Sequence, residues 1–412
     1  MARRGTVQRR TTAAAVALLA PLALVACGGG DDTAADATGE VTSLTVQDYY
    51  NNEPDNTVYQ EALEACGQQV GVSIERTSVP GDSLIAKVLQ QSSSRTLPDI
   101  LMLDNPDLQQ IAASGALAPL GDFGLSAEGY AEGVVDASTY DGELYGLQPV
   151  TNTIALYYNE DVLAQAGVRP PTTWEELKTA AAALTQGDRY GIAFSGINTY
   201  EGTWQFLPFM WSNGGSETEI ASPENAEALQ LWVDLVRSGS ASEAVVGWAQ
   251  ADVNDQFKAG NAAMMINGPW QNPTLNETAG LNYGIAPIPV PQAGDEAVAP
   301  LGGETWTIPQ TGDEARQAAA AEVVECLTSD ENQLALAEKR FTVPTKTAVA
   351  ERYGQQVPEM QAFVDMVPTL RARTGELGEE WPEAATKIYT GVQTALTGGA
   401  EPLAALQQAE NG

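Results

Sequence analysis

The chain of 412 residues carries 54 acidic and 20 basic residues and contains no histidine. Its formal net charge of −34 disfavours binding to nucleic acid or to an anionic membrane surface. Without histidine the chain lacks the usual general base and the commonest metal ligand, so we expect no metal site and no cofactor.

The N-terminus has the pattern of an export signal. It opens with four basic residues, Arg3, Arg4, Arg9 and Arg10, which precede an apolar run over 11–26. The run ends in "LVAC", which resembles a bacterial lipobox, where the cysteine is acylated and becomes the new N-terminus. We therefore expect a lipoprotein signal peptide over 1–26, acylation of Cys27 and a flexible tether over 27–40. The alternative is an ordinary cleaved signal followed by an incidental cysteine.

The remaining chain is long enough for two domains. Cleavage before Cys27 leaves 386 of the 412 residues, more than one typical core holds. The four arginines of the signal leave with it, so 16 basic residues face 54 acidic ones and the net charge becomes −38. Because 43% of the residues are hydrophobic and the acidic residues are scattered, this charge indicates a solvated surface on a folded protein.

Two cysteines, Cys66 and Cys326, remain after Cys27. An exported protein is exposed to an oxidising compartment, and two cysteines allow only one intramolecular bridge. We expect a disulfide bond between them, and two buried free thiols are the alternative.

Strands and helices alternate along the chain. Apolar periodicity and turn residues predict strands at 43–46, 72–75, 100–103, 153–158 and 262–266, and helices at 56–69, 84–89, 173–184, 222–239, 313–328 and 384–396. The order strand, helix, strand, helix, strand over the first hundred residues indicates an α/β layer with a largely parallel sheet. The segment 286–291, together with the glycines at 302 and 303, is the best candidate for a connection between lobes.

No catalytic motif is evident. The sequence contains neither a P-loop nor a Gly-x-Ser-x-Gly elbow nor a Cys-x-x-Cys pair. Paired carboxylates could serve a glycosidase, but such pairs carry little information among 54 acidic residues. Catalysis is therefore not the expected function.

The tryptophans are more informative than the carboxylates. Five of them follow turn-rich segments that also carry amides or carboxylates: Trp204, Trp248, Trp270, Trp306 and Trp381. Indole rings stack on the apolar faces of sugars, while carboxylates and amides bind the hydroxyl groups. The alternative for each is an ordinary packing residue, because tryptophan is usually largely buried.

Six segments occur in the order found in a known family: "LPDILMLDNPDLQQIAASGAL" (97–117), "DGELYGLQPVTNTIALYYNEDVL" (141–163), "PPTTWEELKTAAAALT" (170–185), "WSNGG" (211–215), "FKAGNAAMMINGPW" (257–270) and "FTVPTK" (341–346). With the lipobox ahead of them, the chain resembles the extracellular solute-binding protein family 1, the maltose-binding-like lipoproteins that feed ABC sugar importers. The resemblance covers essentially the whole mature chain.

This resemblance implies an α/β, two-lobe periplasmic-binding-protein-like fold of type II, with the ligand between lobes joined by three crossings. We expect crossings near 150, 300 and 355, an N-lobe over 41–150 and 301–355, and a C-lobe over 151–300 and 356–412. Cys66 and Cys326 then lie in the same lobe, which favours the bridge. Each lobe would supply half of the site, and ligand would stabilise the closed form.

The resemblance also implies a set of ligand-binding residues. Asn152 stands where the maltose-binding member has an acidic residue, which argues against maltose itself, and Trp270 matches the sugar-stacking tryptophan of the family. The full set is Tyr49, Asn51, Asn52, Asp104, Asn105, Asn152, Tyr200, Glu201, Trp204, Trp248, Trp270, Glu304, Trp306, Arg373 and Trp381.

These observations predict a monomeric binding protein, not an enzyme, at the outer face of the cytoplasmic membrane. It would capture a small-molecule carbohydrate, such as an oligosaccharide, and deliver it to the permease subunits of an ABC transporter. A non-sugar solute such as a polyol phosphate is the alternative ligand, and a secreted glycosidase is the alternative class.

The lipobox generates a direct prediction about attachment to the membrane. Changing Cys27 to Ser should release the protein from the membrane or leave it unprocessed, because the acylated thiol is lost. Detergent-phase partitioning of both forms measures this. Equal partitioning of the variant and the wild type into detergent would contradict acylation at Cys27.

Overall fold

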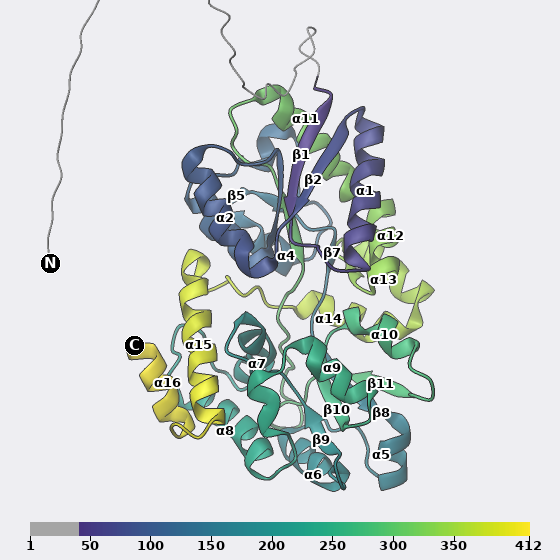
Figure 1. The fold of residues 1–412 in the computed structure, drawn as a ribbon, viewed down its shortest axis with the longest axis vertical. Coiled ribbons are helices and arrows are strands. Elements are labelled where there is room, and N and C mark those ends of the chain that lie inside the picture. Colours follow the sequence, from purple (N-terminus) through teal and green to yellow (C-terminus); the bar gives the residue numbers. More distant parts are fainter. Residues whose placement is uncertain (1–40) are drawn as a thin grey trace, which may run out of the picture.

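The computed structural model describes residues 41–412, so the predicted signal peptide, Cys27 and the tether lie outside the described residues. Two sheets organise these residues into an upper and a lower lobe in Figure 1. We call the lobe built on the sheet that contains the first strand the N-lobe, and the other the C-lobe. Within residues 41–412, no helix combines the length and the apolar character needed to cross a membrane.

The N-lobe sheet has the strand order β2-β1-β3-β12-β6. Its strands are β1 (Ser43–Asp48), β2 (Ser73–Ser78), β3 (Ile100–Asp104), β12 (Glu304–Thr307) and β6 (Gly146–Leu147). The first three are parallel, as the alternation of strands and helices predicts, and β12 returns antiparallel beside β3. A strand from far along the sequence thus completes the sheet of the first lobe.

Helices and short 3₁₀ turns surround the N-lobe sheet, and the last of these helices reaches the C-lobe, where its Phe363 packs beside Tyr157. They are α1 (Asp55–Val70), α2 (Gly81–Ser94), α3 (Leu108–Ala113), α4 (Glu132–Ala137), α11 (Glu314–Leu327), α12 (Asp330–Arg340), α13 (Thr347–Gln356) and α14 (Gln361–Met366), with the 3₁₀ turns η1 (Asn105–Asp107), η2 (Leu120–Phe123), η5 (Pro358–Met360) and η6 (Val367–Thr369). The segment "YDGE" (140–143) forms the turn that joins β4 (Thr139–Tyr140) to β5 (Glu143–Leu144). Both central residues, Asp141 and Gly142, have positive φ, as a tight hairpin requires.

The C-lobe sheet has the strand order β11-β8-β10-β9. Its strands are β8 (Ala155–Asn159), β9 (Tyr190–Ala193), β10 (Ala262–Asn267) and β11 (Tyr283–Ala286). Neighbouring residues of β10 point to opposite faces, and both faces are buried: Met264 joins the core that contains Trp232, whereas Met265 joins the core that contains Tyr157. This explains the uninterrupted apolar run "AAMMI".

The C-lobe helices have clear local causes. They are α5 (Glu160–Ala166), α6 (Trp174–Leu184), α7 (Tyr200–Ser212), α8 (Pro223–Arg237), α9 (Gln250–Lys258), α10 (Asn272–Asn276), α15 (Trp381–Leu396) and α16 (Pro402–Asn411), with the 3₁₀ turns η3 (Glu243–Gly247), η4 (Pro269–Gln271) and η7 (Gly378–Glu380). Side-chain caps begin two of these helices: the hydroxyl of Thr173 accepts from the backbone of Glu176, and Ser222 caps α8 with Pro223 in its first turn.

Three extended segments meet where the lobes join. Asn152, just after β7 (Val150–Thr151), forms an antiparallel bridge with Gly302, and Pro300 forms a parallel bridge with Arg371. β7 itself pairs with β13 (Val343–Pro344). The third segment of this junction is therefore centred near 371, farther along the chain than the crossing expected near 355. The exact lobe boundaries stay a prediction.

A disulfide bond joins Cys66 on α1 to Cys326 on α11. The two cysteines are 260 residues apart in the sequence, so the bond closes a very long loop that starts and ends in the N-lobe and contains the strands of the C-lobe sheet. Constraining the unfolded chain in this way stabilises a protein by roughly 2–5 kcal/mol.

Candidate functional site

The N-lobe sheet presents polar side chains at the edge that faces the junction between the lobes. Tyr49 follows the end of β1, Asp104 ends β3, and Glu304 begins β12 directly opposite Asp104. The Tyr49 hydroxyl donates to Glu304 Oε1 at 2.6 Å. Burial, followed by the charge of Glu304, raises the pKa of Tyr49 well above its usual value. Ligands of open α/β sheets commonly bind at such strand ends.

A buried arginine lies behind this edge. The guanidinium carbon of Arg340 lies 4.8 Å from the ring centroids of both Tyr50 and Tyr59, and these two rings stack on each other at 4.1 Å. Its guanidinium donates to both carboxylate oxygens of Asp55 and lies 3.5 Å from Glu304 Oε2. Glu304 is therefore a neutralised, buried carboxylate whose position is fixed from two sides.

The first turns of α7 belong to the C-lobe and lie close to these strand ends, because Trp204 of this helix stacks on Arg373, which bonds Asp104. The helix begins at Tyr200 because the Thr199 hydroxyl caps it, so Trp204 lies within the helix and not on a loop as the sequence indicates. Tyr200 is 49% exposed and lies beside Tyr389 of α15, with 6.2 Å between ring centroids. Glu201 accepts a hydrogen bond from the backbone of Gln250 and so connects α7 to α9.

Trp270 lies in the 3₁₀ turn η4, immediately after β10. Its ring lies over Gly268, since a Cβ atom at that glycine would come within 2.0 Å of the indole. The indole is partly buried and packs against the C-lobe core. Trp248 is also partly buried and contacts both core clusters. Both indoles keep part of their surface accessible.

Gly302 allows the connecting segments to approach closely. A Cβ atom at this position would lie 2.1 Å from Asn152 Oδ1 and 2.7 Å from Trp204 Cη2. The Gly302 carbonyl accepts from Gln148 Nε2 and Thr151 Oγ1, each at 2.8 Å. Asn152 and Trp204 thus both lie next to the same backbone segment.

Arg373 is already paired. It donates to the two carboxylate oxygens of Asp104 at 2.8 and 3.3 Å and to Asn105 Oδ1 at 3.2 Å. Its guanidinium also stacks on Trp204, 4.7 Å from the ring centroid. These predicted residues do come together, but Trp204 is only 7% exposed and its face is covered by the arginine. Trp204 and Arg373 are therefore unsuited to direct contact with a ligand.

Other predicted residues lie apart from this group. Trp306 is fully buried beside Tyr59 in the N-lobe core, and Trp381 is 3% exposed in the C-lobe core. The expectation that these two indoles contact a ligand is corrected, because no face is available. Asn51 and Asn52 are exposed in the loop after β1.

Sequence reasoning missed Asp107 in η1, between Asp104 and α3. Burial, and then the neighbouring Asp104 carboxylate, raise the pKa of Asp107 to about 7, while Arg373 opposes the shift. Asp107 also contributes to the raised pKa of Tyr200, after the effect of burial, which places the two groups near one another from opposite lobes. No sequence pattern distinguishes this carboxylate from its many acidic neighbours.

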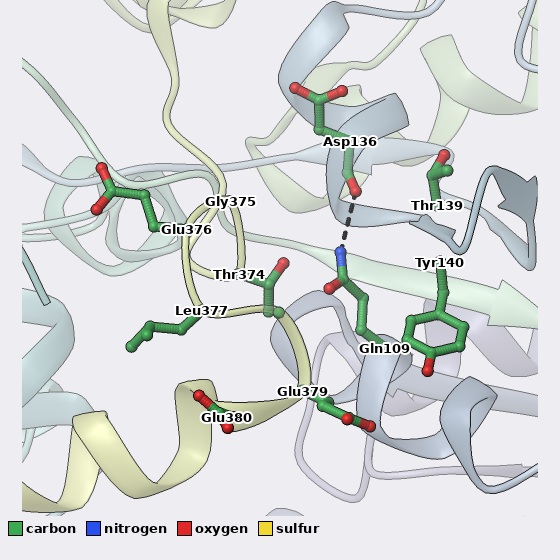
Figure 2. A pocket seen from close by; sticks show the side chains of 11 residues that line it. Gln109, Asp136, Thr139, Tyr140, Thr374, Gly375, Glu376, Leu377, Glu379 and Glu380 are labelled. Atoms are coloured by element: carbon green, nitrogen blue, oxygen red, sulfur yellow. Dashed lines mark hydrogen bonds between the residues drawn. The ribbon is translucent and has the colours of Figure 1, made fainter. Parts of the chain in front are cut away.

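A crevice of about 670 Å³ opens between the N-lobe and the segment that leads into α15. Figure 2 shows the side chains that line it, which are Gln109, Asp136, Thr139, Tyr140, Thr374, Glu376, Leu377, Glu379 and Glu380. Gln109 donates to the backbone carbonyl of Asp136 across one wall. The lining is acidic and polar, which suits hydroxyl-rich or cationic molecules more than anions.

Comparison with known proteins finds one matching family and several similar proteins with related descriptions. The family described as "Bacterial extracellular solute-binding protein" matches residues 61–365. A maltooligosaccharide ABC transporter solute-binding lipoprotein of Streptococcus pneumoniae serotype 4 is 27% identical over 353 residues, covering 80% of this chain and 79% of that protein. A galactooligosaccharide-binding protein of Bacillus subtilis is 23% identical over 405 residues, covering 94% and 92%.

A solved structure supports the same relationship. Maltose-bound MalE3 of T. maritima matches with a TM-score of 0.78 and 25% identity, covering 90% of this chain and 98% of that one. The predicted two-lobe α/β fold of type II is confirmed by this match.

The raised pKa of Asp107 predicts a pH dependence of stability. Its folded pKa of about 7 exceeds the unfolded value of about 3.9, so the folded state holds the proton more tightly between these two values. The free energy of unfolding should therefore fall as pH rises from about 4 to 7. Asp107→Asn should remove this contribution. The free energy of unfolding of the variant minus that of the wild type should therefore be larger at pH 8 than at pH 5. Denaturant unfolding at both pH values measures the difference, and an identical pH dependence in the two proteins would contradict it.

Proposed function

Because the chain belongs to the bacterial extracellular solute-binding protein family, we propose that it captures a carbohydrate, and specifically an oligosaccharide, between its two lobes. It delivers this ligand to the permease subunits of an ABC transporter. The names of two relatives, a maltooligosaccharide-binding lipoprotein and a galactooligosaccharide-binding protein, support this ligand class. The relatives are binding proteins, so the chain is a binding protein and the glycosidase alternative is set aside.

One observation carries the ligand class: the arginines at the junction are already neutralised, while aromatic side chains keep accessible surface. Arg373 is paired with Asp104, and Arg340 with Asp55 and Glu304. These pairs leave neither guanidinium free to bind a phosphate or carboxylate ligand. Tyr200 and Trp270 can instead stack on sugar rings, while Asp107 and Asn152 bind hydroxyl groups.

The protein acts, in this proposal, as a monomer held at the outer face of the cytoplasmic membrane by acylated Cys27. The lipobox motif, together with the lipoprotein named among the relatives, supports the anchor. The tether over 27–40 then gives the folded lobes reach toward the permease.

The ligand class is tested by thermal unfolding of the protein with a panel of sugars and, as anionic counterparts, glycerol 3-phosphate and glucose 6-phosphate. A ligand at about 100 times its dissociation constant adds about 2.7 kcal/mol to the free energy of unfolding. We expect stabilisation by at least one oligosaccharide and none by the phosphates. Stabilisation by the phosphates alone would contradict the proposal.

Trp270 should be an affinity determinant. Its position in a short turn fixed by Pro269 restricts the indole before ligand arrives, so little entropy is lost on stacking. Trp270→Ala should weaken binding of the stabilising sugar by about 1–3 kcal/mol, roughly 5- to 150-fold in dissociation constant. Trp270→Phe should keep part of the affinity. Titration calorimetry measures both variants.

Trp174 provides the control for a structural role. It is 8% exposed in α6, and its Nε1 donates to the Pro289 carbonyl at 3.0 Å. Trp174→Ala should lower the unfolding midpoint while leaving the dissociation constant close to that of the wild type. If Trp270→Ala behaved in the same way, Trp270 would be a packing residue and its proposed role would be wrong.

A further inference from the structure

Two arginines of the third connecting segment, Arg371 and Arg373, have matching surroundings. Each one pairs with a carboxylate and stacks on a tryptophan of α7. The partners of Arg371 lie on the C-lobe side, whereas the partners of Arg373 lie in both lobes. This difference indicates a structural role for Arg371 and a positioning role for Arg373.

Arg371 makes its side-chain contacts on the C-lobe side. It donates to both carboxylate oxygens of Glu217 at 3.1 Å and to Glu376 Oε1 at 2.6 Å, and it stacks on Trp211 at 4.5 Å. Trp211 donates its own Nε1 to the same Glu217. This closed network attaches the connecting segment to the helices of the C-lobe.

Arg373 makes contacts in both lobes. It bonds Asp104, the last residue of β3 in the N-lobe sheet, and the adjacent Asn105. It stacks on Trp204, which belongs to α7 and the C-lobe core. A planar guanidinium suits this role, because its edge can bond a carboxylate while its face covers an aromatic ring.

The arrangement of Arg373 is costly for a residue that served stability alone. Arg373 is only 7% exposed, and its Nε is buried with no hydrogen-bond partner among the described residues. A buried charge and an unpaired donor both oppose folding. Arg373 bonds the Asp104 carboxylate, and its charge also lowers the pKa of Asp107, against the effects of burial and of Asp104.

We propose that Arg373 is a positioning residue that couples the two lobes: it holds the Asp104 carboxylate of the N-lobe against the Trp204 face of the C-lobe. The lobe separation set in this way fixes how far apart the ligand-binding groups of the two lobes lie. The inference rests on the proposed binding of a solute between the lobes, and it names the side chain that governs their approach. Loss of Arg373 removes both contacts and leaves Asp104 and Asp107 to repel each other.

The test measures the distance between the lobes in the absence of sugar. Leu89 of α2 and Leu403 of α16 are exposed, at 39% and 41%, and lie in different lobes (Figure 1). Spin labels on non-natural ketone side chains at these two positions leave the Cys66–Cys326 bond intact, and pulsed electron resonance then gives the distribution of distances. Arg373→Ala should shift the distribution to longer distances and broaden it. Arg373→Lys, which keeps the charge but not the planar face, should give an intermediate shift.

Arg371→Ala is the matched control. It should lower the unfolding midpoint and leave the distance distribution unchanged, since its contacts stay on the C-lobe side. Asp104→Asn should also lengthen the distance, and combining it with Arg373→Ala should add little, because the two residues act through one contact. An unchanged distribution in Arg373→Ala and Asp104→Asn, or an equal shift in Arg371→Ala, would overturn the inference. Because no sugar is present, failure of the sugar panel leaves this result interpretable.

Discussion

The backbone pairing of three connecting segments around Gly302 is the constraint on which the rest of the structure depends. Gly302 donates to the Asn152 carbonyl at 2.9 Å, and its own carbonyl accepts from Gln148 and Thr151. Next to it, Leu301 donates to the Arg371 carbonyl at 2.8 Å. Because these bonds involve the main chain, they fix where each sheet edge and each helix terminus can reach the junction. The glycine is required here, since any side chain would collide with Asn152 and Trp204.

Although basic residues are scarce, several of them form ion pairs with carboxylates at or near the junction between the lobes. The chain has 20 basic residues against 54 acidic ones, yet the side chains of Arg76, Arg340 and Arg373 are largely buried at or near the ends of the N-lobe strands. Arg76 pairs with the fully buried Asp48 at the end of β1. Arg340 pairs with Glu304, and Arg373 pairs with Asp104. Asp48, Glu304 and Asp104 therefore each have a fixed cationic partner, which lets an acidic protein keep ordered polar groups in its interior.

Much of the fold could be predicted from local patterns in the sequence. Strands such as β3 and β10 carry uninterrupted apolar runs because helices cover both faces, and caps such as Thr173 and Ser222 mark helix starts. The placement of β12 in the N-lobe sheet was not predictable in this way. It depends on pairing with β3 across some two hundred residues, and pairings of such long range leave no trace in local periodicity.

The candidate site was harder to predict because the same residues that mark loops also begin helices. The segment "NTYEG" (198–202) before Trp204 contains turn-forming residues, yet Thr199 caps α7 and the backbone turns into the helix at Tyr200. This one difference moves Trp204 from the surface into the C-lobe core and leaves Tyr200 exposed at the helix start. It also brings the Trp204 ring under Arg373. Trp204, which the sequence assigns to ligand binding, thus stacks on Arg373, which bonds Asp104 of the N-lobe. Only the three-dimensional arrangement distinguishes stacking on a ligand from stacking on this arginine.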